Sequence, residues 1–158
     1  MPTETDALSW LDCLDPKKGS ASLAALGKPR SAQSPKGFFL PACESVGRYG
    51  SSQQPATAVE TAQTAVVGIR ACELRALNYL DKVMLEGEFE DPAYRARREG
   101  MLLISCDCVD CTETCFCPLV GGQPYATEGF DINLTPMPDG YLADVATQRG
   151  SQWLGEPA

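Results

Sequence analysis

Two short apolar runs predict buried β-strands. Residues 65–69 (AVVGI) and 101–105 (MLLIS) are continuous and aliphatic, as in strands that are covered on both faces. Between them, apolar residues recur at helical spacing over residues 73–85, with charged residues on the opposite face. Residues 91–98 begin with Asp-Pro, which is typical of a helix start, and Gly100 is a plausible helix end. The pattern predicts the order strand, helix, helix, strand.

The connection between these two strands is long enough for them to be parallel neighbours. In a parallel pair, the carboxyl ends of both strands lie at the same edge of the sheet. Cys72 comes shortly after the first strand, and Cys106 and Cys108 come directly after the second. The sequence therefore predicts that cysteines far apart in the chain lie together at one edge.

A β-hairpin is predicted after this unit. Residues 130–135 and 141–147 alternate apolar and polar positions on either side of the turn residues 138–140 (Pro-Asp-Gly). The expected fold is α/β, with a small parallel βαβ core and an added β-hairpin. Residues 38–158 are expected to form a single domain.

The beginning of the chain has a weaker pattern. Residues 1–37 contain few core-forming positions and, from Asp15 onward, many Ser, Gly, Pro and Lys residues, which predicts an extended N-terminal arm. Residues 38–45 (FFLPACES) are expected to be extended around Pro41. An arm of this kind is more easily explained if it becomes ordered against a partner chain.

Composition excludes several classes of function. The chain has 158 residues, of which 44% are hydrophobic and 22% are charged, as in an average globular domain. The formal net charge of −8 repels nucleic acid and anionic lipid, and there is no histidine to act as a general base or zinc ligand. No stretch has the length and apolarity of a membrane span, and the N-terminus lacks a secretory leader pattern. We expect a cytoplasmic protein without nucleic acid binding or membrane insertion.

The eight cysteines are unusual because five of them fall between Cys106 and Cys117. In a reducing compartment, closely spaced cysteines indicate metal ligation or redox chemistry more than structural disulfides. Such thiolates repel one another unless a cation or an iron-sulfur core absorbs their charge. Zinc is the alternative cofactor, although its familiar pattern of two well-separated CxxC pairs is missing. Cys13 and Cys43 lie in weakly patterned segments and are interpreted as small hydrophobic residues.

A third hypothesis is a thiol oxidoreductase that uses Cys115 or Cys117. This activity requires a lowered thiol pKa, which favours the reactive thiolate. Asp107, Asp110 and Glu113 lie beside the cysteines and act in the opposite direction. Ligation is therefore the stronger interpretation of the cluster.

Several segments resemble the N-terminal domain of a known family. Between residues 38 and 153 they read FFLPACESVGRY, VVGIRACELRAL, DPAYRARRE, a CxxxxxxCFC pattern that ends at Cys117, and DGYLADVATQRG. Similar segments are found in the beta subunits of sulfhydrogenases and NiFe hydrogenases and in the corresponding electron-transfer subunits of anaerobic sulfite reductases. The resemblance covers most of the chain.

The resemblance implies an iron-sulfur cluster with one ligand from the VVGIRACELRAL segment and three from the CFC loop. On this sequence the ligands are Cys72, Cys108, Cys115 and Cys117. Cys106 and Cys111 are additional thiols that could substitute for them. The chain reads RACE at residues 70–73, where family members usually read RPCD. It stops at Ala158, without the ferredoxin-like domain of larger relatives, and so could be a natural short form or a subunit that passes electrons to a partner.

The cysteines and the resemblance together predict an electron-transfer subunit of anaerobic metabolism. It is expected to carry one [4Fe-4S] cluster in a multi-subunit hydrogenase, sulfur or sulfite reductase, or heterodisulfide reductase complex. Because the chain has no flavin or nucleotide motif, it is not expected to be catalytic alone. The expected partners are flavoprotein or ferredoxin-like redox subunits that contact residues 108–122. The alternative function is a zinc-stapled interaction module.

Overall fold

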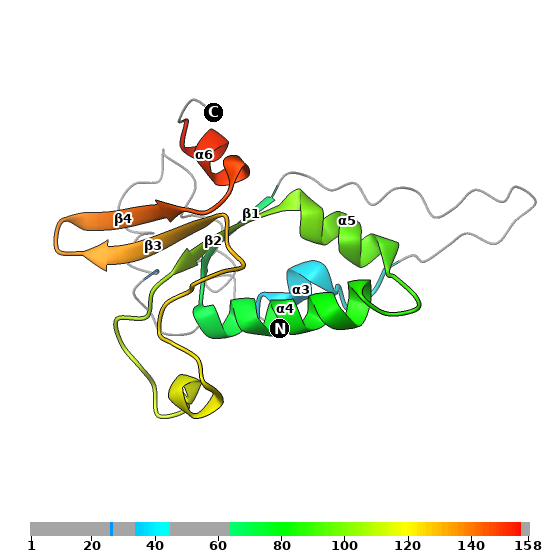
Figure 1. The fold of residues 1–158 in the computed structure, drawn as a ribbon, viewed down its shortest axis with the longest axis horizontal. Coiled ribbons are helices and arrows are strands. Elements are labelled where there is room, and N and C mark those ends of the chain that lie inside the picture. Colours follow the sequence, from blue (N-terminus) through cyan, green and yellow to red (C-terminus); the bar gives the residue numbers. More distant parts are fainter. Residues whose placement is uncertain (1–25, 27–33, 45–63, 156–158) are drawn as a thin grey trace, which may run out of the picture.

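The computed structural model describes Leu26 and residues 34–44 and 64–155 (Figure 1). The predicted arm lies outside these residues except for Leu26 and residues 34–37, and Cys13 also lies outside them. The described helices and strands are α3 (Lys36–Phe39), β1 (Thr64–Ile69), α4 (Ala71–Leu85), α5 (Pro92–Gly100), β2 (Met101–Cys106), the 3-10 helix η2 (Cys117–Val120), β3 (Ile132–Met137), β4 (Gly140–Val145) and α6 (Gln148–Leu154).

The predicted α/β fold is confirmed. Four strands form one sheet in the order β1-β2-β3-β4, with β1 and β2 parallel and β3 and β4 antiparallel. β3 also runs parallel to β2, so three strands end at the same edge of the sheet. The hairpin turn is shorter than expected, because Met137 already pairs with Gly140.

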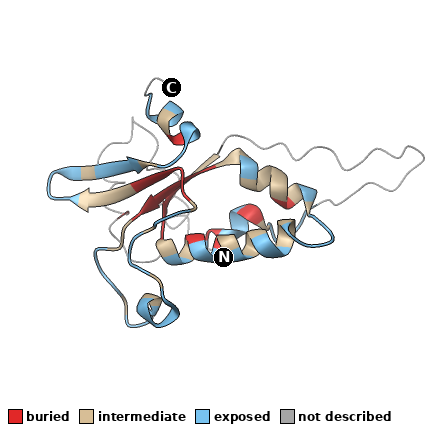
Figure 2. Cartoon of the chain, in the orientation of Figure 1, coloured by how far each residue is buried: buried red, intermediate tan, exposed pale blue. Residues whose placement is uncertain are grey.

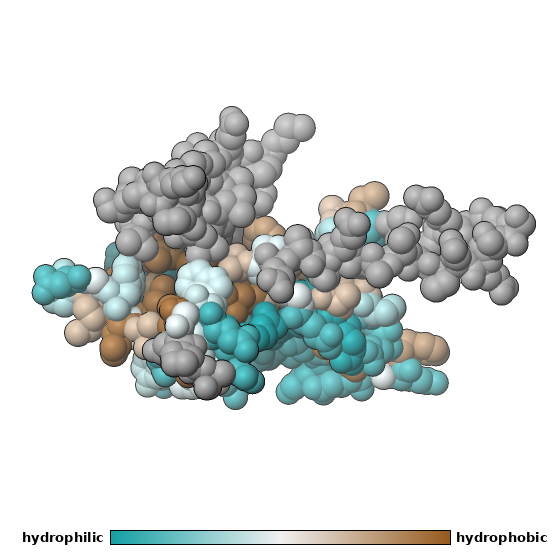
Figure 3. Space-filling view, turned by 90° about the horizontal axis from the view of Figure 1, so that it is seen from above, coloured by the Kyte–Doolittle hydropathy of each residue, from teal (hydrophilic) through white to brown (hydrophobic). Residues whose placement is uncertain are grey.

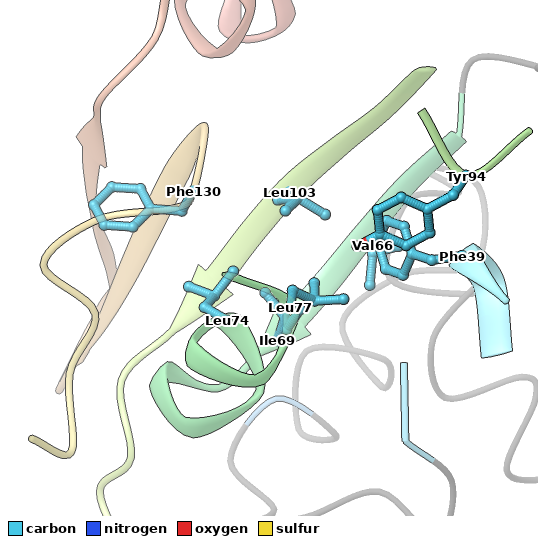
Figure 4. Packing of buried hydrophobic residues seen from close by; sticks show 8 residues of the cluster. All are labelled: Phe39, Val66, Ile69, Leu74, Leu77, Tyr94, Leu103 and Phe130. Atoms are coloured by element: carbon cyan, nitrogen blue, oxygen red, sulfur yellow. The ribbon is translucent and has the colours of Figure 1, made fainter. Parts of the chain in front are cut away.

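β1 and β2 are buried on both faces, as their continuous apolar runs predicted, whereas β4 is mostly exposed. Figure 1 shows α3, α4 and α5 on one side of the strands and α6 on the other. The face toward α4 and α5 contains the core shown in Figure 4, formed by Phe39, Val66, Ile69, Leu74, Leu77, Tyr94, Leu103 and Phe130. The opposite face has a second group, formed by Leu26, Val67, Leu102, Ile104, Cys106 and Ile132. Figure 2 shows that the buried residues concentrate in the strands between these layers.

A bulge in β1 sets the direction in which the strand ends. Val67 pairs with Ile104, whereas Ile69 pairs with the next residue, Ser105, so Gly68 is an extra residue in β1. Gly68 has a φ of 82°, which glycine adopts without steric cost. The bulge places Ile69 on the same face as Val66, toward α4. The chain then leaves the sheet edge directly into α4.

Polar contacts hold the helical layer together. The Asp91 carboxylate accepts hydrogen bonds from the amides of Ala93 and Tyr94, both at 2.9 Å, and so caps α5 as predicted. The Tyr94 hydroxyl donates to Asp81 at 2.6 Å and thereby connects α5 to α4. Arg97 donates to the carbonyl oxygen of Phe39 at 2.7 Å. Arg98 also donates to the Asp81 carboxylate at 3.1 Å, so these two arginines of α5 have structural partners within the domain.

Two elements differ from the sequence expectations. Residues 36–39 form the helical turn α3 instead of an extended segment, because Pro35 starts the turn at a φ of −64° and the Leu40 amide donates back to Lys36. α6 lies beyond the predicted hairpin, in residues for which the sequence predicted no element. Its first turn is capped by Thr147, whose hydroxyl accepts a hydrogen bond from the Gly150 amide.

No helix among the described residues is both long and apolar enough to cross a membrane.

The contact of α6 with the sheet predicts a sensitive position. A Cβ atom at Gly150 would lie 2.5 Å from the carbonyl oxygen of Asp131 and 3.0 Å from Cγ1 of Ile132. Gly150→Ala should therefore destabilise the protein by about 1–3 kcal/mol, because neither neighbour can move without disturbing the sheet. Gly37→Ala is the control, since its Cβ would meet no atom within 4 Å. Urea unfolding measures both; equal stabilities for the two variants would contradict this packing.

Candidate metal centre

The loop between β2 and β3 begins with an anchored residue, Asp107. Its amide donates to the carbonyl oxygen of Leu134 at 2.9 Å. Its carboxylate accepts from the amide group of Asn133 at 2.9 Å and from the hydroxyl of Thr135 at 2.6 Å. The carboxylate of Asp107 is thus held by β3, and the position of Cys108 follows from this anchor.

Further hydrogen bonds close the cysteine loop on itself. The amide of Cys108 donates to the carbonyl oxygen of Pro124 at 2.8 Å, which connects the start of the loop to the segment that follows η2. Near the tip, the amide of Gly122 donates to the carbonyl oxygen of Cys117 at 2.8 Å. Gly121 ends η2 with a φ of 67°, a conformation that favours glycine. The loop is therefore shaped by its own backbone, although Figure 2 shows that most of it is exposed.

The start of α4 lies beside this loop. Cys72 is the second residue of α4 and is exposed. Glu73 caps the helix, since its carboxylate accepts a hydrogen bond from the Arg70 amide at 2.9 Å. In the same part of α4, close to Cys72, the Arg75 side chain donates to the carbonyl oxygen of Val120 at 2.6 Å. This bond joins α4 directly to η2.

A cavity of about 950 Å³ lies between α4 and the loop. The four cysteines that the sequence selects as ligands all line it: Cys72, Cys108, Cys115 and Cys117. Cys108 and Cys117 are partly buried, whereas Cys72 and Cys115 are exposed. Among the described residues, no group of three or more Cys, Asp or Glu side chains is placed to hold a metal ion. The four thiols thus share one cavity without converging on a single point.

The two substitute cysteines lie elsewhere. Cys106 is the last residue of β2 instead of the first residue of the loop, and its side chain packs in the second core group, on the sheet face away from α4. It is 1% exposed. Cys111 is exposed and does not line the cavity. Strand alternation explains the position of Cys106, because side chains two residues apart along β2 share a face.

Burial raises the pKa of the Cys108 thiol above its usual range. The positive charge of Arg70 opposes this rise, while the thiols of Cys117 and Cys115 add to it. Burial also raises the pKa of Cys106, again against the effect of Arg70. Without a bound cation, both residues therefore favour the protonated thiol, which is the less reactive form.

Sequence reasoning missed the role of Arg70. The residue is 4% exposed, and its guanidinium donates to the carbonyl oxygens of Cys106 at 3.1 Å, Asp107 at 2.9 Å and Leu26 at 2.6 Å. Its position directly after a buried strand was the available signal, because a charged residue there must find partners or reach solvent.

Comparison with characterised proteins finds one distant similarity. Over 133 residues the chain is 29% identical to the sulfhydrogenase 2 subunit beta of Pyrococcus furiosus. The match covers 84% of this chain and 38% of that relative, so the chain spans well under half of the relative's length. No protein-family model matches the chain, and no solved structure matches it. The similarity supports the resemblance to hydrogenase beta subunits at a distance.

The raised pKa of Cys108 predicts the pH dependence of its modification in metal-free protein. Iodoacetamide reacts with the thiolate, so the rate at Cys108 should still be rising above about pH 8.5, where an ordinary thiol is half ionised. Peptide mapping of the alkylated protein measures the rate at each cysteine. The exposed Cys111 serves as the internal control for reagent reactivity. A rate at Cys108 that levels off below about pH 8.5 would contradict the effect of burial.

Proposed function

We propose that this chain is an electron-transfer subunit or domain that carries one [4Fe-4S] cluster in a multi-subunit redox complex. The observation that carries the proposal is the shared cavity. Four thiols from two segments, far apart in sequence, line one space between the start of α4 and the cysteine loop. Soft thiolate ligands favour iron-sulfur clusters or zinc. The distant similarity to a sulfhydrogenase beta subunit supports the choice of a cluster and of a hydrogenase-type complex.

The proposed ligands are the four cavity cysteines, Cys72, Cys108, Cys115 and Cys117. A zinc ion bound by four thiolates requires sulfur atoms about 3.8 Å apart, given zinc-sulfur distances near 2.3 Å. The thiols of the described residues form no such compact group, and the distant similarity to a sulfhydrogenase beta subunit favours the larger iron-sulfur cluster. A bound cluster would supply reversible uptake of single electrons. The exposed loop allows the thiols to adjust to it.

The surrounding residues have separate tasks in this proposal. The first turn of α4 places the positive end of the helix dipole near Cys72, on the side of the cavity where the proposed cluster would carry negative charge. Asp107 fixes the start of the loop to β3, and Arg75 holds the carboxyl end of η2 against α4. These contacts position the ligand-bearing segments without using the carboxylate of Asp107 as a ligand. The exposed side of the site leaves an edge through which a partner can exchange electrons.

The first test is the metal content of protein purified without oxygen. We expect iron and inorganic sulfide in equal amounts, with an EPR signal after reduction by dithionite. Replacement of Cys72, Cys108, Cys115 or Cys117 by Ala should each lower the iron content sharply, because an incomplete ligand set exposes one iron to water. Cys111→Ala and Cys43→Ala are the matched controls and should retain the cluster, since neither residue lines the cavity.

Two results would contradict this part of the proposal. Tightly bound zinc in a colourless protein would favour the alternative, a zinc-stapled interaction module. An unchanged iron content and EPR signal in Cys72→Ala would remove the ligand contributed by α4. The cluster would then belong to the loop alone.

The surface near the cavity is suited to a protein partner. Five large hydrophobic side chains of the loop between β2 and β3 are exposed: Val109, Phe116, Leu119, Val120 and Tyr125. Of these, Leu119 is 87% exposed. By contrast, the face seen in Figure 3 shows mostly hydrophilic side chains with smaller hydrophobic areas between them. A flavoprotein or ferredoxin-like subunit with a basic rim would complement both the apolar loop and the net charge of −8.

The partner contact can be tested with two equally exposed residues. Leu119→Ser should weaken association about tenfold, or about 1.4 kcal/mol, because it removes an apolar contact beside the proposed cluster. Phe89→Ser is the control, since Phe89 is 84% exposed but lies in the connection between α4 and α5, outside the cysteine loop. Tagged variants are purified from native extract at moderate salt, and the co-purified redox subunit is quantified. Equal recovery with both variants would place the contact elsewhere.

A further inference from the structure

Thr112 contacts the sulfur atom of one proposed ligand through both its backbone and its side chain. Its amide donates a hydrogen bond to the Sγ atom of Cys115 at 3.3 Å. Its hydroxyl oxygen lies 3.4 Å from the same Sγ atom, within hydrogen-bond distance. The amide of Cys115 in turn donates to the carbonyl oxygen of Thr112 at 2.9 Å. Residues 112–115 therefore form a turn that fixes the Cys115 sulfur relative to the backbone of the loop.

A second threonine extends this group of contacts. The Oγ1 atom of Thr114 lies 3.0 Å from the Oγ1 atom of Thr112, so the two hydroxyl groups share a hydrogen bond. Thr114 lines the cavity together with Cys115, while Thr112 is partly buried. Two hydroxyl groups in series thus lead to a sulfur atom in the wall of the cavity.

Ligation of Cys115 would fix the direction of these hydrogen bonds. A thiol both donates and accepts, whereas the sulfur of a ligating thiolate has no proton and only accepts. The Thr112 hydroxyl must then donate to the sulfur, and its oxygen remains available to accept from the Thr114 hydroxyl. Each donor in such a series strengthens the next, because a hydrogen bond polarises the group that accepts it.

We propose that Thr112 is a positioning residue that holds Cys115 in place as a ligand and raises the reduction potential of the bound cluster. This inference rests on the proposed function. Reduction moves one electron from a donor redox subunit to the cluster, and the ligand sulfurs share the added negative charge. Hydrogen bonds to a ligand sulfur stabilise this charge, so the potential rises.

Thr127 provides a matched control. It lines the same cavity from another part of the loop between β2 and β3. Within the part of the chain that the structure describes, its hydroxyl makes no hydrogen bond to a cysteine sulfur. Replacement of threonine by valine exchanges a hydroxyl for a methyl group and keeps the branched side chain. The two positions therefore separate loss of a sulfur contact from loss of a hydroxyl group near the cavity.

The experiment measures the midpoint potential of the unchanged protein and of Thr112→Val, Thr112→Ser and Thr127→Val, by redox titration followed by EPR. Iron content and circular dichroism are recorded for each protein. We expect a more negative potential in Thr112→Val, a potential near the original in Thr112→Ser, which keeps the hydroxyl, and no shift in Thr127→Val. A folded Thr112→Val protein that loses its iron, while Thr112→Ser retains it, would support the positioning role.

Other outcomes would overturn the inference. It fails if loaded Thr112→Val keeps the original potential, if Thr127→Val or Thr112→Ser shifts the potential equally, or if both Thr112 variants lose their iron. Where Thr112→Val does not fold, Thr114→Val decides, because it removes the donor to the Thr112 hydroxyl. An unchanged potential in that variant would then contradict the inference. These results leave the proposed function intact, whereas absence of iron and sulfide from the unchanged protein would contradict that function and the inference with it.

Discussion

The hydrogen bonds of the Arg70 guanidinium connect the parts on which the site depends. A buried cation is costly unless polar groups surround it, and here three backbone carbonyls serve as acceptors. They belong to Leu26, to the end of β2 and to the loop. Because one side chain bridges all three, the start of α4, the strand edge and the loop cannot move independently. The relative position of the two cysteine-bearing segments depends on this constraint.

The sheet brings Arg70 to this position through its parallel strands and one glycine. β1, β2 and β3 all end at the same edge, so the chain leaves β1 and β2 as neighbours. The bulge at Gly68 adds a residue to β1, which turns Ile69 toward α4. Arg70 follows immediately and reaches across to β2. A strand without the bulge would direct these side chains to the opposite faces.

The polar residues around the cavity divide between structural and chemical roles. Two of the acidic residues beside the cysteines have structural roles in the loop. The carboxylate of Asp107 accepts hydrogen bonds from Asn133 and Thr135 of β3. Asp110 accepts a hydrogen bond from the Cys111 amide within the loop. Neither of these two carboxylates lines the cavity, whereas four thiols do. This assignment agrees with the proposed binding of a cluster and with a surface-exposed path for electrons.

The sequence by itself determined the elements whose signals are local. Apolar runs marked β1 and β2, helical periodicity marked α4, and Asp91 with Pro92 marked the start of α5, because each pattern depends on neighbouring residues. The resemblance of its segments to hydrogenase beta subunits also implied the four cysteines that line the cavity. The tertiary structure decided the rest: Cys106 faces away from α4, α6 packs on the sheet through Gly150, and Arg70 finds its acceptors 36, 37 and 44 residues away. Such contacts depend on strand register and long-range packing, which no local pattern encodes.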